Sequence, residues 1–169
     1  MRRGPRRAKG MNLRDLITED LILADMKARD KRAAINEIVA FMCTRNGISE
    51  ENARKVEAAV LRRESRGTTG IGKGVAIPHA KNCGQVDEIV AAFGVARDGI
   101  PFAALDGEPV RLVFLVVSPR GLENDHLRVM RKIAHMARDD KTNRFLATTR
   151  DFGTLRAILD EVDEYFEKK

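Results

Sequence analysis

The sequence predicts an α/β (α+β) protein, a three-layer α/β/α sandwich built around one sheet. Helical patterns occupy both ends of the chain, and short apolar runs of strand length occupy its middle. The most apolar run, Val110–Val117, is hydrophobic at nearly every position, which is typical of a strand buried on both faces. A sheet buried on both faces needs a layer of helices on each side.

The order of elements follows from apolar spacing and from capping residues. Apolar residues at helical spacing predict a helix over Asp30–Arg45, and Ser49 is expected to cap a second helix that runs to about Arg66. The later elements are bounded by turn residues and prolines in the same way. The sequence predicts strands over Leu21–Ala24, Val75–Ile77, Ile89–Val95 and Val110–Val117, and helices over about Asp125–Arg138 and Phe152–Phe166.

Length and charge predict one domain over residues 11–169 and a basic, disordered tail over residues 1–10. The chain has 169 residues and a net charge of +6, but the first ten residues carry five basic side chains and no acid. The remainder is almost neutral, so we expect no nucleic-acid binding by the folded domain, although the tail can act electrostatically. No apolar run is long enough to span a bilayer. We therefore expect no membrane insertion and a cytoplasmic location.

A glycine-rich segment, Gly67–Gly74, comes close to a nucleotide-binding loop without fulfilling its requirements. Gly74 follows Lys73, so the hydroxyl that would bind magnesium is missing. A helix precedes the segment and a strand follows it, which is the reverse of the order that places a helix N-terminus against phosphates. We expect the loop to connect helix and strand or to receive another anionic group through its backbone amides.

The three histidines occupy different environments in the predicted fold. His79 follows Pro78, which fixes the local backbone and is expected to end the pairing of a short strand. The imidazole is thereby held at the mouth of the glycine loop. His126 and His135 share one helix but lie nine residues apart, on opposite sides. His126 is expected beside the buried stripe and His135 in solvent, so a metal site built from both is not expected. The expected buried stripe consists of Leu127, Met130, Ile133, Ala134 and Ala137.

Arg63 continues an apolar stripe, Val56 and Val60, at the last turn of its helix. A guanidinium in that position needs an anionic partner or a route to water. Its role is either a structural ion pair or the binding of a phosphate. Arg62 and Arg66 are expected at the surface.

The run Arg63–Lys81 closely resembles the active-site segment of the enzyme IIA proteins of the sugar phosphotransferase system, fructose/mannitol class. Within that class it is most similar to the nitrogen-regulatory branch. Two further stretches agree, Asp106–Leu115 and Asp125–Leu127. The resemblance covers essentially all of residues 11–169, and it implies a mixed central sheet. Ala80 and Lys73 depart from the residues frequent in the family, glycine and a small polar residue respectively.

The resemblance implies a set of site residues and a reaction. It makes His79 the phosphorylated residue, with Arg63 and His126 completing the catalytic site. It also implies a phosphohistidine carrier protein of the HPr kind as donor, and no metal or other cofactor. We expect the amides and hydroxyls of the loop to bind phosphoryl oxygens; the residues concerned are Thr68, Thr69, Gly70 and Gly72.

Three roles fit this resemblance. The first is a phosphotransferase component with a regulatory, nitrogen-type role, whose phosphorylation state decides which target protein it binds. The second is a sugar-transport enzyme IIA that serves a permease. The third is a regulatory binding module that accepts no phosphate, which the presence of Arg63, His79 and His126 together disfavours. We favour the first.

Overall fold

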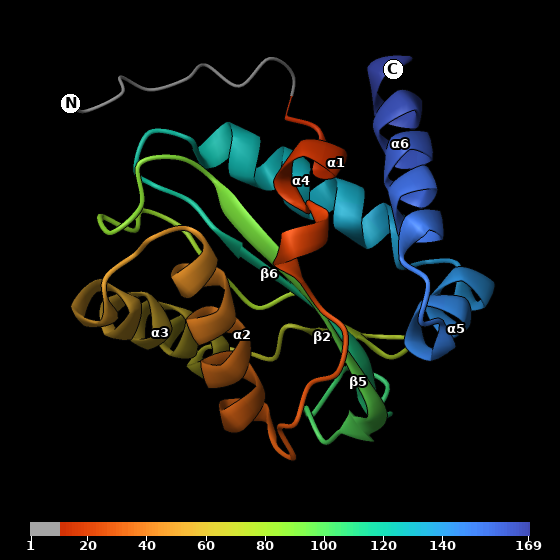
Figure 1. Ribbon diagram of the computed structural model, residues 1–169, viewed down its shortest axis with the longest axis horizontal. Coiled ribbons are helices and arrows are strands. Elements are labelled where there is room, and N and C mark those ends of the chain that lie inside the picture. Colours follow the sequence, from red (N-terminus) through yellow and green to blue (C-terminus); the bar gives the residue numbers. More distant parts are fainter. Residues whose placement is uncertain (1–10) are drawn as a thin grey trace.

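The computed structural model describes residues 11–169, so the predicted tail over residues 1–10 lies outside the described part. Two helices cover one face of a central sheet, and the remaining α-helices cover the other face (Figure 1). None of the helices in residues 11–169 is long and apolar enough to cross a membrane. The helices are α1 (Leu13–Leu16), the 3-10 turn η1 (Glu19–Leu21), α2 (Lys31–Arg45), α3 (Glu50–Ser65), α4 (Glu123–Met136), α5 (Asp140–Thr148) and α6 (Gly153–Glu167).

The sheet is mixed, which confirms the expectation from the resemblance. Its strands lie in the order β1-β5-β6-β3-β2, and β4 pairs with β6 beyond the end of β3. β5 and β6 are antiparallel, whereas β3 and β4 both run parallel to β6. The strands are β1 (Ile22–Leu23), β2 (Gly70–Gly72), β3 (Val75–Ala76), β4 (His79–Ala80), β5 (Val90–Ile100) and β6 (Val110–Val117).

Ser49 caps the start of α3 as predicted, and Asp30, which was predicted as the first residue of a helix, caps α2. The Asp30 side chain accepts a hydrogen bond from the amide of Ala33 at the start of α2. The Ser49 hydroxyl does the same for the amide of Asn52 in α3. These bonds satisfy amides that have no partner inside the helix.

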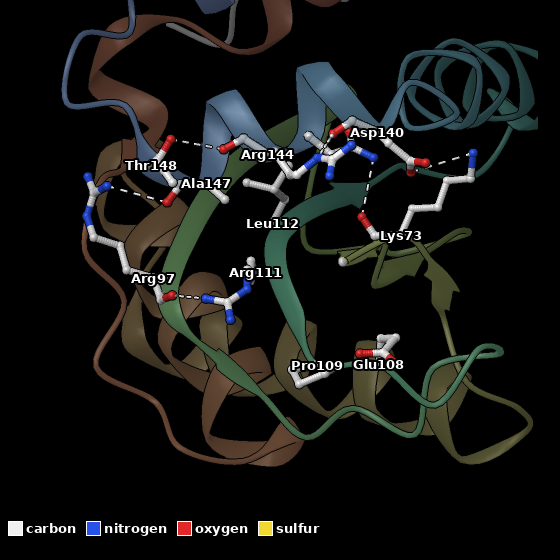
Figure 2. A pocket seen from close by; sticks show the side chains of 12 residues that line it. Lys73, Arg97, Glu108, Pro109, Arg111, Leu112, Asp140, Arg144, Ala147 and Thr148 are labelled. Carbon is white, nitrogen blue, oxygen red and sulfur yellow. Dashed lines mark hydrogen bonds and ion pairs between the residues drawn. The ribbon is translucent and has the colours of Figure 1, made fainter.

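Two α-helices were not predicted from the sequence, the short α1 and α5. α5 begins after Asp139, whose carboxylate accepts from the amides of Lys141 and Thr142. It packs across β5 and β6, near the start of β6 (Figure 2). Nine residues carry too few apolar positions for a periodic pattern to stand out, although the capping aspartate was visible in the sequence.

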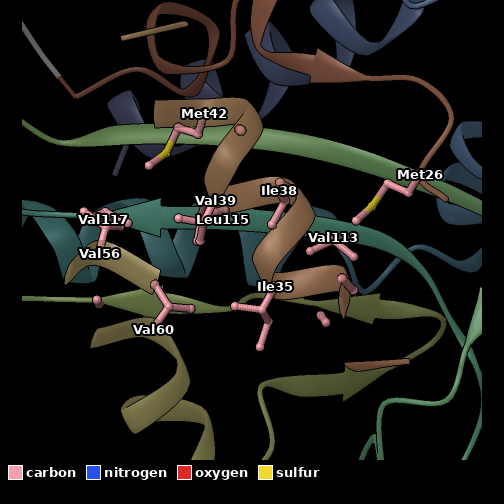
Figure 3. Close-up of a cluster of buried hydrophobic side chains, with 14 of the residues drawn as sticks. Met26, Ile35, Ile38, Val39, Met42, Val56, Val60, Val113, Leu115 and Val117 are labelled. Atoms are coloured by element: carbon pink, nitrogen blue, oxygen red, sulfur yellow. The ribbon is translucent and has the colours of Figure 1, made fainter. Parts of the chain in front are cut away.

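Two hydrophobic clusters hold the layers together, one on each face of β6. Val113, Leu115 and Val117 pack in the cluster under α2 and α3 (Figure 3). Leu112, Phe114 and Val116 pack in the cluster under α1, α4, α5 and α6. β6 is therefore buried on both faces, as predicted, because successive side chains of a strand point to opposite sides.

β3 and β4 form one interrupted strand along the edge of β6. Ala76 lies opposite Val113 and His79 opposite Val116, so the register does not shift across the break. The carbonyl of Pro78 still accepts a hydrogen bond from the amide of Val116. The prediction that pairing ends at Pro78 was wrong, because proline lacks only the amide hydrogen and its carbonyl continues the ladder.

Candidate functional site

His79 is held at the edge of the sheet by its backbone and its ring. β4 pairs only with β6 among the described strands, and His79 lies opposite Val116, whose side chain faces α4. The ring nitrogen Nδ1 is 2.8 Å from the carbonyl oxygen of Ile77. A carbonyl only accepts, so Nδ1 carries the hydrogen in this bond and Nε2 is left without one in the neutral ring.

His126 lies in the first turn of α4 and is buried beside His79. The centroids of the two rings are 5.5 Å apart. Nδ1 of His126 is 2.7 Å from the hydroxyl of Ser118, which is fully buried at the end of β6. Ser118 was not predicted as a site residue, and its only sequence signal was its position directly after the buried strand. The ring of His126 is thus fixed by one hydrogen bond, as the ring of His79 is.

Arg63 comes from the opposite layer. α3 contacts β4, and the Arg63 guanidinium donates to the carbonyl of Gly67 at 2.9 Å. Arg63 is half-buried, while Arg62 and Arg66 are exposed as predicted. It makes no ion pair with a carboxylate in residues 11–169, so its charge is available to an anion placed near the sheet edge.

Glu64, not Arg63, continues the buried stripe of α3. Val56, Val60 and Glu64 are the buried residues of this helix, at i, i+4 and i+8. The Glu64 carboxylate pairs with Lys31 at 2.8 Å and accepts from the amide of Thr69 at 3.0 Å and from its hydroxyl at 2.5 Å. Sequence reasoning missed this role, because an acid next to the expected arginine gave no separate pattern.

The surroundings of both histidines favour the neutral ring. Burial lowers the pKa of His79, the hydrogen bond to Ile77 opposes this effect, and the positive charge of Arg63 adds to the lowering. Burial also lowers the pKa of His126 to about 4, helped by His79 and by Lys81. Lys81 acts on both rings and is a further cation of the site that was not predicted.

The glycine-rich segment is more ordered than expected and most of its donors are already used. Gly70–Gly72 forms β2, and the amide and hydroxyl of Thr69 both bind Glu64. The Thr68 hydroxyl donates to Phe102 and accepts from the amide of Gly70. The Thr69 and Gly70 amides and both hydroxyls are therefore committed within the protein, which differs from the role expected of them.

The segment's two strand glycines allow close contact with the loop before β6. A Cβ on Gly70 would lie 2.8 Å from the Cβ of Ala104. At Gly72 the backbone φ of +96° is one that other residues rarely adopt, and a Cβ would lie 3.1 Å from Asp106. These glycines position the hairpin against residues 104–106.

The inferred buried stripe of the helix from Glu123 to Met136 needs correction. Its buried residues are His126, Val129, Lys132, Ile133 and Met136. Leu127, expected inside, is 48% exposed next to His126. The expected stripe was displaced by about one residue at Leu127, Met130 and Ala134, whereas Ile133 and Ala137 are buried as expected.

His135 lies away from the site, as predicted, but it is not fully solvated. Its ring stacks on Tyr165 at 4.4 Å and meets Phe166 edge-on. Within residues 11–169 no group of three or more histidine, cysteine or carboxylate side chains could hold a metal ion. The titratable and charged side chains gathered around His79 include His126, Arg63 and Lys81.

Comparison with known proteins places this geometry in a family. The family model for "Phosphoenolpyruvate-dependent sugar phosphotransferase system, EIIA 2" matches residues 15–162. The chain is 36% identical over 149 residues to a nitrogen regulatory protein of Bradyrhizobium diazoefficiens, covering 88% of this chain and 95% of that relative. It is 29% identical to the fructose-specific EIIABC component of Bacillus subtilis, covering 91% of this chain but only 24% of that longer protein.

A solved structure has a fold similar to that of this chain. The nitrogen regulatory protein IIA-Ntr of Neisseria meningitidis superposes with a TM-score of 0.77 at 29% identity, covering 86% of this chain and 97% of that one.

Proposed function

Because this chain belongs to the EIIA 2 family of the phosphoenolpyruvate-dependent sugar phosphotransferase system, we propose that it carries a phosphoryl group on His79 and regulates a target protein through that group. The observation that supports this most directly is the hydrogen bond between Nδ1 of His79 and the carbonyl of Ile77. It leaves Nε2 as the nitrogen with a free electron pair. The lowered pKa of His79 keeps that pair unprotonated near neutral pH.

The transfer needs only positioning and charge neutralisation. The Nε2 electron pair of His79 forms a new P–N bond while the P–N bond of the donor's phosphohistidine breaks, and its electron pair goes to the donor's imidazole. Both bonds are phosphoramidates, so the step is close to balanced and reversible. Negative charge spreads over three phosphoryl oxygens during the transfer.

The neighbouring side chains supply groups that can bind these oxygens. If the Ser118 hydroxyl donates to Nδ1 of His126, the hydrogen of that neutral ring is on Nε2 and can be donated to a phosphoryl oxygen. Arg63 and Lys81 add fixed positive charge that already acts on the His79 ring. The direct binding of oxygens by the loop stays a prediction for Gly72; for Thr68, Thr69 and Gly70 we propose an indirect role through the hairpin and Glu64.

The partners follow from the chemistry and from the relatives. A donor that carries phosphohistidine, an HPr-like phosphocarrier protein, matches the acceptor in bond type. Exposed Leu127 beside His126 offers an apolar contact for transient docking. The relatives named nitrogen regulatory protein support a regulatory target downstream, and we propose a cytoplasmic location, where such donors occur.

The test is phosphorylation with phosphoenolpyruvate and the two upstream phosphotransferase proteins. We expect an acid-labile, alkali-stable label in the peptide that contains His79. His79→Ala should abolish labelling, while His135→Ala, which removes the histidine stacked on Tyr165, should leave it unchanged. Equal labelling of wild type and His79→Ala would refute the proposal.

The second candidate function is a sugar-transport component, which the similarity to the fructose-specific protein of Bacillus subtilis favours. The phosphorylated chain would then pass its group to an enzyme IIB domain. Incubation of the labelled protein with a fructose-type IIB distinguishes the two. Rapid loss of label to IIB supports transport, and retention of the label supports regulation.

A further inference from the structure

A second polar site lies at the other end of β6, away from the histidines. A cavity of about 650 Å³ opens between α5, the start of β6, the bend of β5 and the β2–β3 turn. Figure 2 shows the labelled side chains arranged around this space, with α5 along one side and the strands along the other. Arg111 at the cavity lies five residues from Val116, the partner of His79, a separation of ~17 Å along a strand.

The cavity gathers positive charge from four different elements. Its lining includes four cationic side chains and two carboxylates, a net charge of +2. Only one of the cations is neutralised: Lys73 pairs with Asp140 at 3.7 Å. The other three are Arg97, Arg111 and Arg144, and none of them pairs with a carboxylate anywhere in residues 11–169.

All three of these guanidinium groups are held by backbone carbonyls, and Arg144 donates from Nε to the carbonyl of Asp140 at 3.3 Å. Arg97 donates to the carbonyl of Thr149 at 2.9 Å and to that of Ala147 at 3.5 Å. Arg111 donates to the carbonyl of Arg97. A carbonyl orients a guanidinium without cancelling its charge, so the cations are positioned but not neutralised. Gathering like charges in this way costs free energy unless an anion compensates them.

The rest of the lining combines buried apolar side chains with polar ones, among them Asn143 and Thr148. Leu112 and Ala147 lie under the cavity and Pro109 borders it. The volume lies within the range of ligand pockets, which combine an apolar wall with a few fixed polar groups. An inorganic ion would leave most of this space unused, whereas a phosphate group joined to a small organic body would contact both parts.

We propose that this cavity binds a small organic phosphate monoester, at a site separate from the phosphorylated histidine. The phosphate dianion matches the net charge of the lining, and the guanidinium fork matches its oxygens. Leu112 and Pro109 contact the organic body. Gly74 lines the cavity and is followed directly by β3 and His79, so bound ligand and phosphorylation site share one short segment.

The test is a nuclear magnetic resonance titration of the ¹⁵N-labelled protein with phenyl phosphate, at constant ionic strength. We expect saturable shifts of the amides of Gly74, Leu112 and Arg144 and weaker binding of inorganic phosphate, which lacks the organic body. Shifts confined to the amides around His79 and His126 would show binding at the phosphorylation site alone and would overturn the proposal. So would shifts reproduced by sodium chloride.

Matched variants test the cations themselves. Arg144→Gln should weaken phenyl phosphate binding about tenfold, as expected for the loss of one charged hydrogen-bonded partner. Arg131→Gln removes the same charge from an exposed position on α4 and should leave the affinity unchanged. The spectra of both variants report directly that they are folded. Equal affinities in the two variants would overturn the proposal.

Discussion

The two ends of β6 carry polar groups that are organised in opposite ways. At the end near Val116, one buried and one half-buried imidazole are each held by one hydrogen bond, and burial lowers the pKa of both. At the end near Arg111, guanidinium groups are held by carbonyls and keep their charge. The difference separates two tasks: forming a covalent bond requires a free electron pair, whereas reversible binding of an anion requires a charge that does not titrate.

Among substitutions at the two ends of β6, the largest expected effect is on the rate of phosphorylation. Arg63→Ala and His126→Ala should each lower the rate by about 10²–10³-fold, because each removes one group that stabilises developing charge. Arg144→Gln, at the opposite end of β6, should leave the rate within experimental error in the absence of a phosphate ester. Single-turnover transfer from the phosphorylated donor measures both. A loss of rate in Arg144→Gln as large as in Arg63→Ala would remove the separation of tasks.

The second expected effect is a pH dependence of stability that comes from the histidine end alone. In the unfolded chain His126 takes up a proton near pH 6.5, but in the folded protein its pKa is about 4. The unfolded state therefore binds more protons between these values, and the free energy of unfolding falls as the pH is lowered from about 6.5 to about 4. The slope from this residue is at most about 1.4 kcal/mol per pH unit.

Denaturant unfolding at several pH values measures this slope in the wild type and in His126→Asn. The variant should lose less stability than the wild type over the same window. Identical slopes would mean that the folded protein already accepts the proton at His126. Variants of the cavity arginines leave His126 unchanged and should therefore keep the slope of the wild type.

A smaller effect, on the free energy of unfolding, is expected from removing the charge of the buried carboxylate of Glu64. Glu64→Gln should lower the free energy of unfolding by about 2 kcal/mol, because the buried carboxylate binds Lys31 and both donors of Thr69. Thermal and denaturant unfolding measure the loss. Glu51→Gln on the same helix, where the carboxylate is exposed, should change it by less than about 0.5 kcal/mol.

The smallest effect concerns Asp140, the carboxylate partner of Lys73 at the cavity. Asp140→Asn should cost less than about 0.5 kcal/mol of stability, because both side chains of this pair are about half exposed. The same change should strengthen phenyl phosphate binding, since it removes a negative charge from the lining. Calorimetric titration measures this gain, and a weaker affinity would contradict the proposed role of the net charge.

The sequence predicted the layers and most helices because these depend on local patterns. Ser49 caps its helix as expected, and the apolar run of β6 is buried on both faces. The order of the strands could not be predicted, since pairing between distant segments leaves no local trace. The same reason explains the missed role of Ser118, which meets His126 only through the packing of α4 on the end of β6.

The sequence predicted three side chains of the proposed site, but not Ser118, Lys81 or Glu64 and not how the individual atoms are engaged. His79, Arg63 and His126 were recognised from the motif, but the acceptor for Nδ1 of His79 could not be, because a backbone carbonyl is present at every residue. The glycine loop was misjudged for a related reason. Its composition suggests free donors, and only the structure shows that Glu64 and residues 104–106 already engage it.

Because the register against β6 does not shift across Pro78, the number of residues between Val75 and His79 is fixed. Val75 and His79 both face the α4 layer because they are four positions apart, an even step along the strand. Deleting or inserting a single residue between them would turn the imidazole toward the α2–α3 layer, with every motif residue still present. Variation among natural or engineered forms of this chain should therefore be tolerated between Val75 and His79 as exchange of side chains and rejected as change of spacing.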